Sequence, residues 1–259
     1  MDDDLNARTR RATITWMHRW SPRLLSFRIE RDPGFRFVPG QFARLGLLKE
    51  NGAPVWRAYS MTSASWDDFL EFYSIVVPDG EFTSRLEKLG VGDTLMIEKA
   101  ANGFFTTNRF ADGRDLWMFG TGTGLAPYLS ILQDETTWQR FERLILVHGA
   151  RVGADLAYRD EIAALRHHPL WAEHGHKLIY QPVATREAVP GALQARIPEL
   201  IGDGGLEAAL DIPFTDAASR FMICGSPDMV RDTHKALMAR GFRLSRLAAP
   251  GHIAVENAW

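Results

Sequence analysis

The chain has 259 residues, which is enough for one or two domains with a core of normal size. Its formal net charge of −2 argues against bulk binding of nucleic acid, and no apolar run approaches the roughly 20 residues that span a bilayer. The single cysteine, Cys224, excludes an internal disulfide, a cysteine-rich zinc site and a cysteine-ligated iron–sulfur cluster, and we predict no metal site. The start Met-Asp-Asp-Asp lacks the character of a signal peptide, so we expect a cytoplasmic protein.

The first half of the chain, from about residue 12 to residue 112, is predicted to consist of short strands. Strands are expected at 13–16, 24–30, 43–48, 55–62, 69–77 and 94–98, with a short helix at 82–88. Asn51-Gly52 is typical of a hairpin turn between two of them. Strands this short and this closely spaced predict a small antiparallel barrel.

Around residues 111–114 the pattern changes to strands that alternate with helices, which predicts a parallel sheet. Further strands are expected at 143–148, 177–183 and 221–224, and helices at 128–133 and from 225 to about 240. We therefore predict an α+β protein of two domains, with an antiparallel β-barrel at 1–112 and an α/β domain with a parallel sheet at 113–259.

The predicted α/β domain begins with an apolar strand that leads into a glycine-rich loop. Residues 116–127 read Leu-Trp-Met-Phe-Gly-Thr-Gly-Thr-Gly-Leu-Ala-Pro. Glycines between a strand and a helix let the backbone approach a ligand closely, and the N-terminus of a helix favours negative charge. The loop is interpreted as a nucleotide phosphate site, with an ordinary strand–helix turn as the alternative.

A cation follows the next strand of this domain. In NAD-binding folds an acidic residue about 20 residues after the glycines binds the ribose 2′-hydroxyl. Here Arg151 stands after the strand at 143–148 and the dipeptide Gly149-Ala150. Because a guanidinium suits a 2′-phosphate, NADP is favoured over NAD.

Four consecutive residues in the barrel half carry groups suited to a cofactor, namely Arg57, Ala58, Tyr59 and Ser60. Arginine fits a pyrophosphate, tyrosine offers a flat face to an aromatic ring, and serine can hydrogen-bond a ring nitrogen. On a regular strand Arg57 and Tyr59 share one face and Ser60 points to the other, unless the backbone bends. An ordinary strand with surface side chains is the alternative.

Other motifs permit close approach of a ligand or a ring. Residues 80–86 place a glycine before a helix start with hydroxyls, which is either an anion-binding turn or plain helix capping. Gly103 either forms a turn or lets a ring come close. Cys224 ends a strand, where α/β folds place ligands, although a buried free cysteine is more often a core residue. The chain ends on Trp259, an aromatic side chain that costs solubility unless it packs against a partner.

These motifs follow one another in the order found in one family of flavoenzymes. They lie at residues 57–60, 80–86, 103–105, 120–127 and 224–227 and at the aromatic terminus. The chain resembles the bacterial type of the ferredoxin/flavodoxin–NADP+ reductase family over nearly its whole length. The resemblance implies a barrel that binds FAD, an α/β domain that binds NADP(H), and a flavin between them.

The resemblance also implies which residues bind FAD. Arg57 would hold the phosphates, Tyr59 would stack on the isoalloxazine ring, and Ser60 would hydrogen-bond near flavin N5. Further contacts are implied for Ala58, Tyr73, Thr123 and the turn formed by Glu81, Phe82 and Thr83. In the tail, Trp259 would stack on the adenine, and Ala258 would lie at the isoalloxazine face opposite Tyr59, where plant-type members place a tyrosine.

For NADP, the resemblance implies arginines around the 2′-phosphate and a contribution from the start of the last helix. The implied residues are Arg151, Val152, Arg186, Arg196, Ser226, Pro227 and Asp228. Catalytic roles are implied for Ser60, for Cys224 against the nicotinamide without covalent chemistry, and for Glu256 as a proton-relaying group near both.

These expectations describe an FAD-dependent oxidoreductase that transfers hydride between NADPH and FAD, and single electrons between FAD and ferredoxin or flavodoxin. We expect a monomer whose acidic partners are steered by part of an arginine set near the N-terminus, comprising Arg8, Arg10, Arg11, Arg19, Arg23, Arg28 and Arg31. The alternatives are an NAD(P)H-dependent flavin or ferric reductase, the reductase component of an oxygenase system, and a flavin-binding sensor that does not react.

Overall fold

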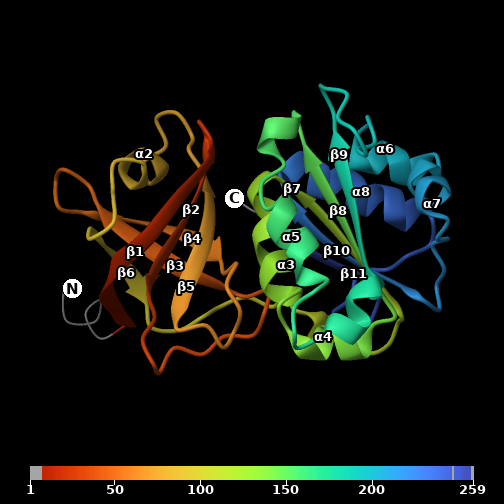
Figure 1. Cartoon of the computed structure of the whole chain (residues 1–259), viewed down its shortest axis with the longest axis horizontal. Helices are drawn as coiled ribbons and strands as arrows, with labels where there is room; N and C mark the ends of the chain where they lie inside the picture. The colour runs from red at the N-terminus through yellow and green to blue at the C-terminus, as the bar shows by residue number, and fades with distance from the viewer. Residues whose placement is uncertain (1–7, 247, 258–259) are drawn as a thin grey trace.

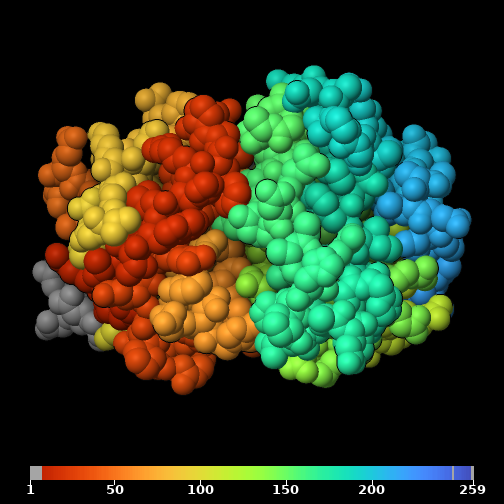
Figure 2. Space-filling view, in the orientation of Figure 1, coloured from red at the N-terminus to blue at the C-terminus, as the bar shows by residue number. Residues whose placement is uncertain are grey.

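The computed structural model describes residues 8–246 and 248–257, which form two domains side by side (Figure 1). The barrel domain, with strands β1–β6, comes first in the chain, and the sheet domain, with strands β7–β11, follows. In the space-filling view the red N-terminal part of the barrel domain lies directly against the green part of the sheet domain (Figure 2). The predicted α+β fold with a barrel followed by a parallel sheet is confirmed.

The barrel is a sheet of six antiparallel strands in the order β4-β3-β6-β1-β2-β5. The strands are β1 Thr9–Ser21, β2 Leu24–Glu30, β3 Phe42–Leu48, β4 Pro54–Ser60, β5 Phe69–Ile75 and β6 Thr94–Glu98, and the short helix α2 is Thr83–Leu86. Beyond β4 the chain crosses to the other edge of the sheet, where Met61 bridges Phe72 of β5. This crossing closes the barrel at the end of β4.

Alternating apolar residues fill the barrel. In β2, Phe27 and Ile29 are fully buried and pair across the ladder with Phe72 and Leu70 of β5, which are also fully buried. Each such side chain stabilises the fold by about 1.5–3 kcal/mol relative to exposure. The closed core therefore holds the strand ends in place, including the end of β4.

The sheet domain has five strands in the order β11-β10-β7-β8-β9, and all neighbours are parallel. The strands are β7 Asp115–Thr121, β8 Arg143–Ala150, β9 Leu178–Ala184, β10 Ser219–Gly225 and β11 Ile253–Asn257. The α-helices are α3 Ala126–Ile131, α4 Glu135–Arg140, α5 Arg159–Leu165, α6 Ile197–Gly202, α7 Gly205–Leu210 and α8 Pro227–Ala239. The 3-10 helices are η1 Thr107–Arg109, η2 Gly122–Leu125, η3 Gly153–Asp155 and η4 Ala172–Lys177.

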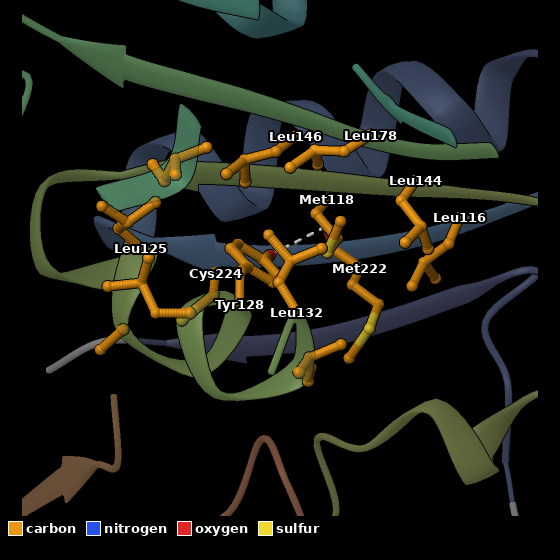
Figure 3. Packing of buried hydrophobic residues seen from close by; sticks show 14 of the residues in the cluster. Leu116, Met118, Leu125, Tyr128, Leu132, Leu144, Leu146, Leu178, Met222 and Cys224 are labelled. Carbon is orange, nitrogen blue, oxygen red and sulfur yellow. Dashed lines mark hydrogen bonds between the residues drawn. The ribbon is translucent and has the colours of Figure 1, made fainter. Parts of the chain in front are cut away.

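Side chains of the parallel strands alternate between two cores. One core lies on the side of α3 and α5 and includes residues of the barrel domain; its sheet residues include Leu116, Met118, Leu144, Leu146, Leu178, Met222 and Cys224 (Figure 3). The other core lies on the side of α6, α7 and α8 and includes Trp117, Phe119, Ile145, Val147, Phe221 and Ile223. Since the first core also contains Leu24, Tyr73 and Phe105, the two domains share a continuous apolar contact.

The predicted bounds of β2 and β6 agree with the structure, whereas β1 and β11 differ from expectation. β1 is much longer than the strand expected at 13–16, because its first part pairs with β6 and its second part with β2. β11 was not predicted as a strand; it gains regular structure by pairing with β10 as an edge strand. The pairing carries the C-terminal segment back toward the barrel.

Of the helices in the described residues, none is long and apolar enough to cross a membrane.

Candidate active site between the two domains

A cleft of about 210 Å³ lies where the end of β4 faces the carboxyl ends of the parallel strands. The barrel domain contributes Phe42, Arg57, Ala58, Tyr59, Ser60, Tyr73, Ser74, Ile75, Val77 and Thr83. The sheet domain contributes Thr123, Ala126, Cys224, Glu256 and Asn257. Ligands of open α/β sheets bind outside the carboxyl ends of the strands, so this cleft has the position expected of a functional site.

Four consecutive residues of β4 line the same cleft, although strict alternation would turn Ser60 away from Arg57 and Tyr59. The reason is the bend that closes the barrel. Ser60 still pairs with Phe42 of β3, but the next residue, Met61, pairs with β5. The change of partner turns the backbone, and side chains from both faces of the strand reach one space.

The Tyr59 ring lines the cleft as an uncharged aromatic surface, and its neighbours hold it in place. Its hydroxyl lies 2.9 Å from Ser74 Oγ, and its ring packs against Phe82 with the centroids 5.5 Å apart. Burial raises the pKa of Tyr59 to about 12. Arg57 beside it is exposed, with Nη1 donating to Trp56 O at 2.8 Å, so most of its guanidinium donors face solvent.

The side chains of the turn at residues 81–83 are engaged within the barrel domain. The Phe82 side chain is buried in the barrel core, and the Glu81 carboxylate is paired with Lys49 Nζ at 2.6 Å. Thr83 Oγ1 accepts a hydrogen bond from the Val77 N–H at 3.1 Å, and no side chain caps α2. The hydroxyl of Thr83 therefore fixes the loop after β5 instead of capping the helix.

Ser60, Cys224 and Glu256 meet across the domain boundary. Cys224 of β10 and Glu256 of β11 are register partners, and the Ser60 hydroxyl hydrogen-bonds the Glu256 side chain. Burial raises the pKa of the Glu256 carboxyl to about 7. Burial and the Glu256 charge raise the pKa of the Cys224 thiol well above its usual value. Cys224 is thus a protonated thiol, without the thiolate character of a nucleophile.

The glycine-rich loop packs directly on the end of β10. A Cβ added to Gly124 would lie 2.3 Å from Cys224 O, closer than real side chains come to a backbone atom. Thr121 Oγ1 accepts a hydrogen bond from the Ser226 N–H at 3.3 Å, which ties this loop to the start of α8. Glycine at position 124 is therefore required for the two strand ends to close one side of the cleft.

Gly103 fills a comparable role on the barrel side. Its φ is +99°, and an added Cβ would lie 2.9 Å from the Phe42 ring and 3.7 Å from Glu256 Oε1. Of the two interpretations of Gly103, the structure shows the close approach of a ring, that of Phe42.

The arginines expected at the 2′-phosphate occupy different surroundings. The Arg186 N–H donates to Arg151 O at 2.9 Å, so these two residues lie together just beyond the ends of β8 and β9 with both side chains exposed. Arg196, before α6, is ion-paired with Asp232 at 3.1 Å and with Glu199 at 4.0 Å. The structure thus brings Arg151 and Arg186 together, while Arg196 is held by carboxylates.

The other residues expected to contact NADP lie at the same edge of the sheet. Val152 follows Arg151, Ser226 precedes α8, and Pro227 is the first residue of that helix. Asp228 is ion-paired with Arg231 at 2.7 Å, so its carboxylate is engaged within α8. Ala258 and Trp259 lie outside the described residues; the preceding Asn257 lines the cleft.

Several residues of the cleft were not found by sequence reasoning. They are Phe42, Ser74, Ile75, Val77, Ala126 and Asn257. Phe42 reaches the cleft because it pairs with Ser60, and Ser74 because it bonds Tyr59. Neither pairing has a local signal in the sequence.

Some of the N-terminal arginines serve the barrel itself. Arg28 Nε is 2.7 Å from Glu71 Oε2, and its guanidinium lies over the rings of Trp16 and Phe69. Arg31 donates to the backbone carbonyls of Phe35, Ser65 and Asp67. These two arginines therefore stabilise the barrel, and steering of a partner by the arginine set stays a prediction.

The residues present fit a flavin nucleotide. The exposed Arg57 fork suits a pyrophosphate, and the Tyr59 ring suits an aromatic system. Tyr73 lines the cleft with a buried hydroxyl that has no hydrogen-bond partner among the described residues, so a ligand could supply one. The glycine loop gives a close approach of backbone from the opposite side.

Comparison with known proteins agrees with this assignment. A family model described as an oxidoreductase FAD-binding domain matches residues 17–105, and one described as an oxidoreductase NAD-binding domain matches residues 118–235. The two matches follow the order of the barrel domain and the sheet domain.

Relatives match along nearly the whole chain. Identity is 41% over 254 residues to ferredoxin–NADP reductase A of Sorangium cellulosum, covering 95% of this chain and 89% of the relative. Identity is 37% over 250 residues to the flavodoxin/ferredoxin–NADP reductase of Rhodobacter capsulatus, covering 95% and 92%. A crystal structure of a ferredoxin NADP+ reductase from Neisseria gonorrhoeae with bound FAD and NADP superposes with a TM-score of 0.91 at 39% identity, covering 97% and 99%. The chain therefore belongs to the FAD-containing ferredoxin/flavodoxin–NADP+ reductase family, as its sequence motifs led us to expect.

Proposed function

We propose that the protein transfers hydride between NADPH and FAD, and single electrons between FAD and a ferredoxin or flavodoxin. The observation that carries the proposal is the cleft in which Arg57, Tyr59 and Ser60 of the barrel face Cys224 and Glu256 of the sheet. It is supported by relatives that are named for ferredoxin and for flavodoxin. We further propose that the domain boundary lies between residues 112 and 113.

On the barrel side, the residues bind and orient the flavin nucleotide, which when bound supplies both the hydride and the single-electron chemistry. Arg57 binds the phosphates through its guanidinium, with Ala58 and the backbone of residues 81–83 alongside. Tyr59 supports one face of the ring system, and Tyr73 and Thr123 contribute further contacts. Ser60 would hydrogen-bond near the reacting edge of the ring, with Glu256 as its partner on the protein side.

On the sheet side, the residues place the nicotinamide. Arg151 and Arg186 bind the 2′-phosphate, with Val152 and Arg196 nearby, and Ser226, Pro227 and Asp228 border the nicotinamide half of the cofactor. Cys224 keeps its proton and shapes the pocket. Glu256 holds or releases a proton near neutral pH, because its pKa of about 7 lies there, and Ser60 links its carboxyl to the cleft.

Family resemblance favours contacts of Trp259 with the adenine of FAD and of Ala258 with the isoalloxazine ring; both residues lie outside the described residues. We also propose that the protein is a monomer and works in the cytoplasm; size-exclusion chromatography with light scattering tests the monomer directly.

The function is tested with the purified protein in three steps. Its absorbance spectrum should show bound flavin, and NADPH should bleach that flavin much faster than NADH. The reduced protein should then pass electrons to ferredoxin or flavodoxin faster than to free FMN. A colourless protein that stays colourless with excess FAD contradicts the assignment, and preference for free FMN indicates a flavin reductase instead.

A further inference from the structure

A short loop of the sheet domain is fixed to the barrel domain at two points. The 151–158 segment runs from the end of β8 through η3 to the residue before α5. Asp155 Oδ1 accepts a hydrogen bond from Ser21 Oγ of β1 at 3.2 Å. The Tyr158 hydroxyl donates to Glu71 Oε1 of β5 at 2.8 Å. The segment therefore bridges the two domains.

The contact made by Tyr158 is buried and has several hydrogen bonds. Tyr158 is 5% exposed and Glu71 is 7% exposed. The second oxygen of Glu71 accepts from Arg28 Nε at 2.7 Å, and Ser26 Oγ bonds the Tyr158 hydroxyl. A buried carboxylate needs all of these partners, because each unmade hydrogen bond leaves charge without compensation.

The backbone of Tyr158 shows that its position is imposed. Its φ is +62°, in the left-handed region that side chains other than glycine rarely adopt. Such conformations persist where the surrounding structure over-determines them, and they gather at functional positions. Here the surrounding structure is the set of hydrogen bonds to the barrel domain.

The other end of the segment carries the arginines proposed to bind the 2′-phosphate. Arg151 is its first residue, and its carbonyl accepts from the Arg186 N–H at 2.9 Å. The Gly153 N–H donates to Glu187 Oε2 at 2.7 Å, next to Arg186 in the chain. Both arginines are thus hydrogen-bonded into one unit with the segment.

The Tyr158 end reaches the wall of the flavin cleft. The Tyr158 ring meets the Tyr73 ring edge-on with the centroids 5.3 Å apart, and it packs against Trp20 of β1 at 4.4 Å. Tyr73 lines the cleft beside Tyr59 and Ser60. A chain of direct contacts therefore leads from the arginine pair to the flavin cleft.

We infer that the 151–158 segment couples binding of the 2′-phosphate to alignment of the two domains, with Tyr158 as the positioning residue. This inference rests on the proposed function. Binding energy from a part of the substrate that does not react raises the reaction rate only when it improves the geometry at the reacting atoms. The 2′-phosphate then increases the rate of hydride transfer as well as the affinity, and the increase in rate depends on the Tyr158 hydroxyl.

The test compares the wild-type holoenzyme with Tyr158→Phe by stopped-flow reduction of the flavin. Loss of the hydroxyl should lower the limiting reduction rate with NADPH about tenfold, the effect of about one hydrogen bond on a barrier. The limiting rate with NADH should change less than about twofold, because NADH has no 2′-phosphate to couple. Binding of 2′,5′-ADP, measured by calorimetry, should also stay within about twofold, because the arginines are untouched.

Tyr180→Phe is the matched control, since the Tyr180 hydroxyl lies 3.1 Å from His148 Nδ1 within the sheet domain. It should leave both limiting rates unchanged. Ser21→Ala removes the other bridge and should lower the NADPH rate in the same direction by a smaller factor, which keeps the test available if Tyr158→Phe folds poorly.

If Tyr158→Phe lowers the limiting reduction rate equally with NADPH and NADH, or with neither, the inference is overturned. If NADPH does not reduce the flavin of the wild-type protein, the proposed function itself is contradicted. The two failures are therefore distinct.

Discussion

The two sides of the active site are built in different ways. The flavin side consists of strand ends held by a closed, filled barrel, and Tyr59 and Ser60 have partners that fix them there. The 2′-phosphate side consists of loops beyond β8 and β9, where Arg151 and Arg186 are exposed. The side chains of the first side are held by protein partners, whereas those of the second side are exposed to solvent.

The difference indicates how each side should respond to mutation. Changes on the flavin side affect cofactor retention, and changes to its buried groups also affect stability. Changes on the arginine side alter solvated charges whose replacement affects the binding and use of NADPH and leaves the fold intact. Five substitutions test this contrast, from the largest expected effect to the smallest.

Glu256→Gln should have the largest effect, and one that depends on pH. Burial raises the pKa of this carboxyl from 4.5 in the unfolded chain to about 7 in the folded protein. Between these pH values the carboxyl is ionised in the unfolded chain but protonated in the folded protein, so its contribution to the free energy of unfolding falls as the pH rises from 4.5 through 7. At pH 8 the variant should therefore be more stable than the wild type by about 3 kcal/mol, and near pH 4 the two should be equal. Denaturant unfolding of both proteins at both pH values measures this. Equal stabilities at pH 8 would mean that the wall of the cleft accommodates the charge.

Arg57→Ala should weaken FAD binding with no change in fold. Its guanidinium is exposed on the cleft, so removal costs charge-assisted hydrogen bonds to phosphate worth about 2–3 kcal/mol. The dissociation constant of FAD, from fluorescence titration of the apoprotein, should rise accordingly, while the unfolding midpoint of the apoprotein stays the same. Unaltered retention of FAD would place the phosphates elsewhere.

Arg151→Ala and Arg186→Ala should each raise the KM for NADPH and leave the KM for NADH nearly unchanged. The expected loss is about 1–2 kcal/mol each, because the lost contacts are charge-assisted but solvated. Steady-state kinetics with both cofactors gives the ratio of the KM for NADPH to the KM for NADH in each variant and in the wild type. Equal losses on both cofactors would count against a 2′-phosphate site at this edge.

Arg196→Ala should have the smallest effect. This side chain is half exposed and already paired with Asp232 and Glu199, so a phosphate must compete with carboxylates that are in place. The change in KM for NADPH should correspond to less than about 1 kcal/mol. A loss as large as that of Arg151→Ala would show that Arg196 exchanges its partners when NADPH binds.

Much of the site could be predicted because its motifs are local. The glycine loop directly follows an apolar strand, and Arg151 follows the next strand closely, so each of these patterns lies within a few consecutive residues. In β2, apolar and polar residues alternate from Leu25 to Glu30. The strand β11 was missed because its five residues gain partners only by lying beside β10. The helices α4–α7 are short and had no strong periodic signal.

The sequence alone determined the order of barrel and parallel sheet, the family, the cofactors and the residue types of the site, because these depend on local patterning and on motifs in a fixed order. The tertiary structure decided which of those residues meet. The bend after Ser60, the pairing of Cys224 with Glu256, the engagement of Arg196 by carboxylates and the bridge from Tyr158 to Glu71 all join segments far apart in the chain. Contacts of that kind arise from packing and burial, and no local pattern of residues specifies them.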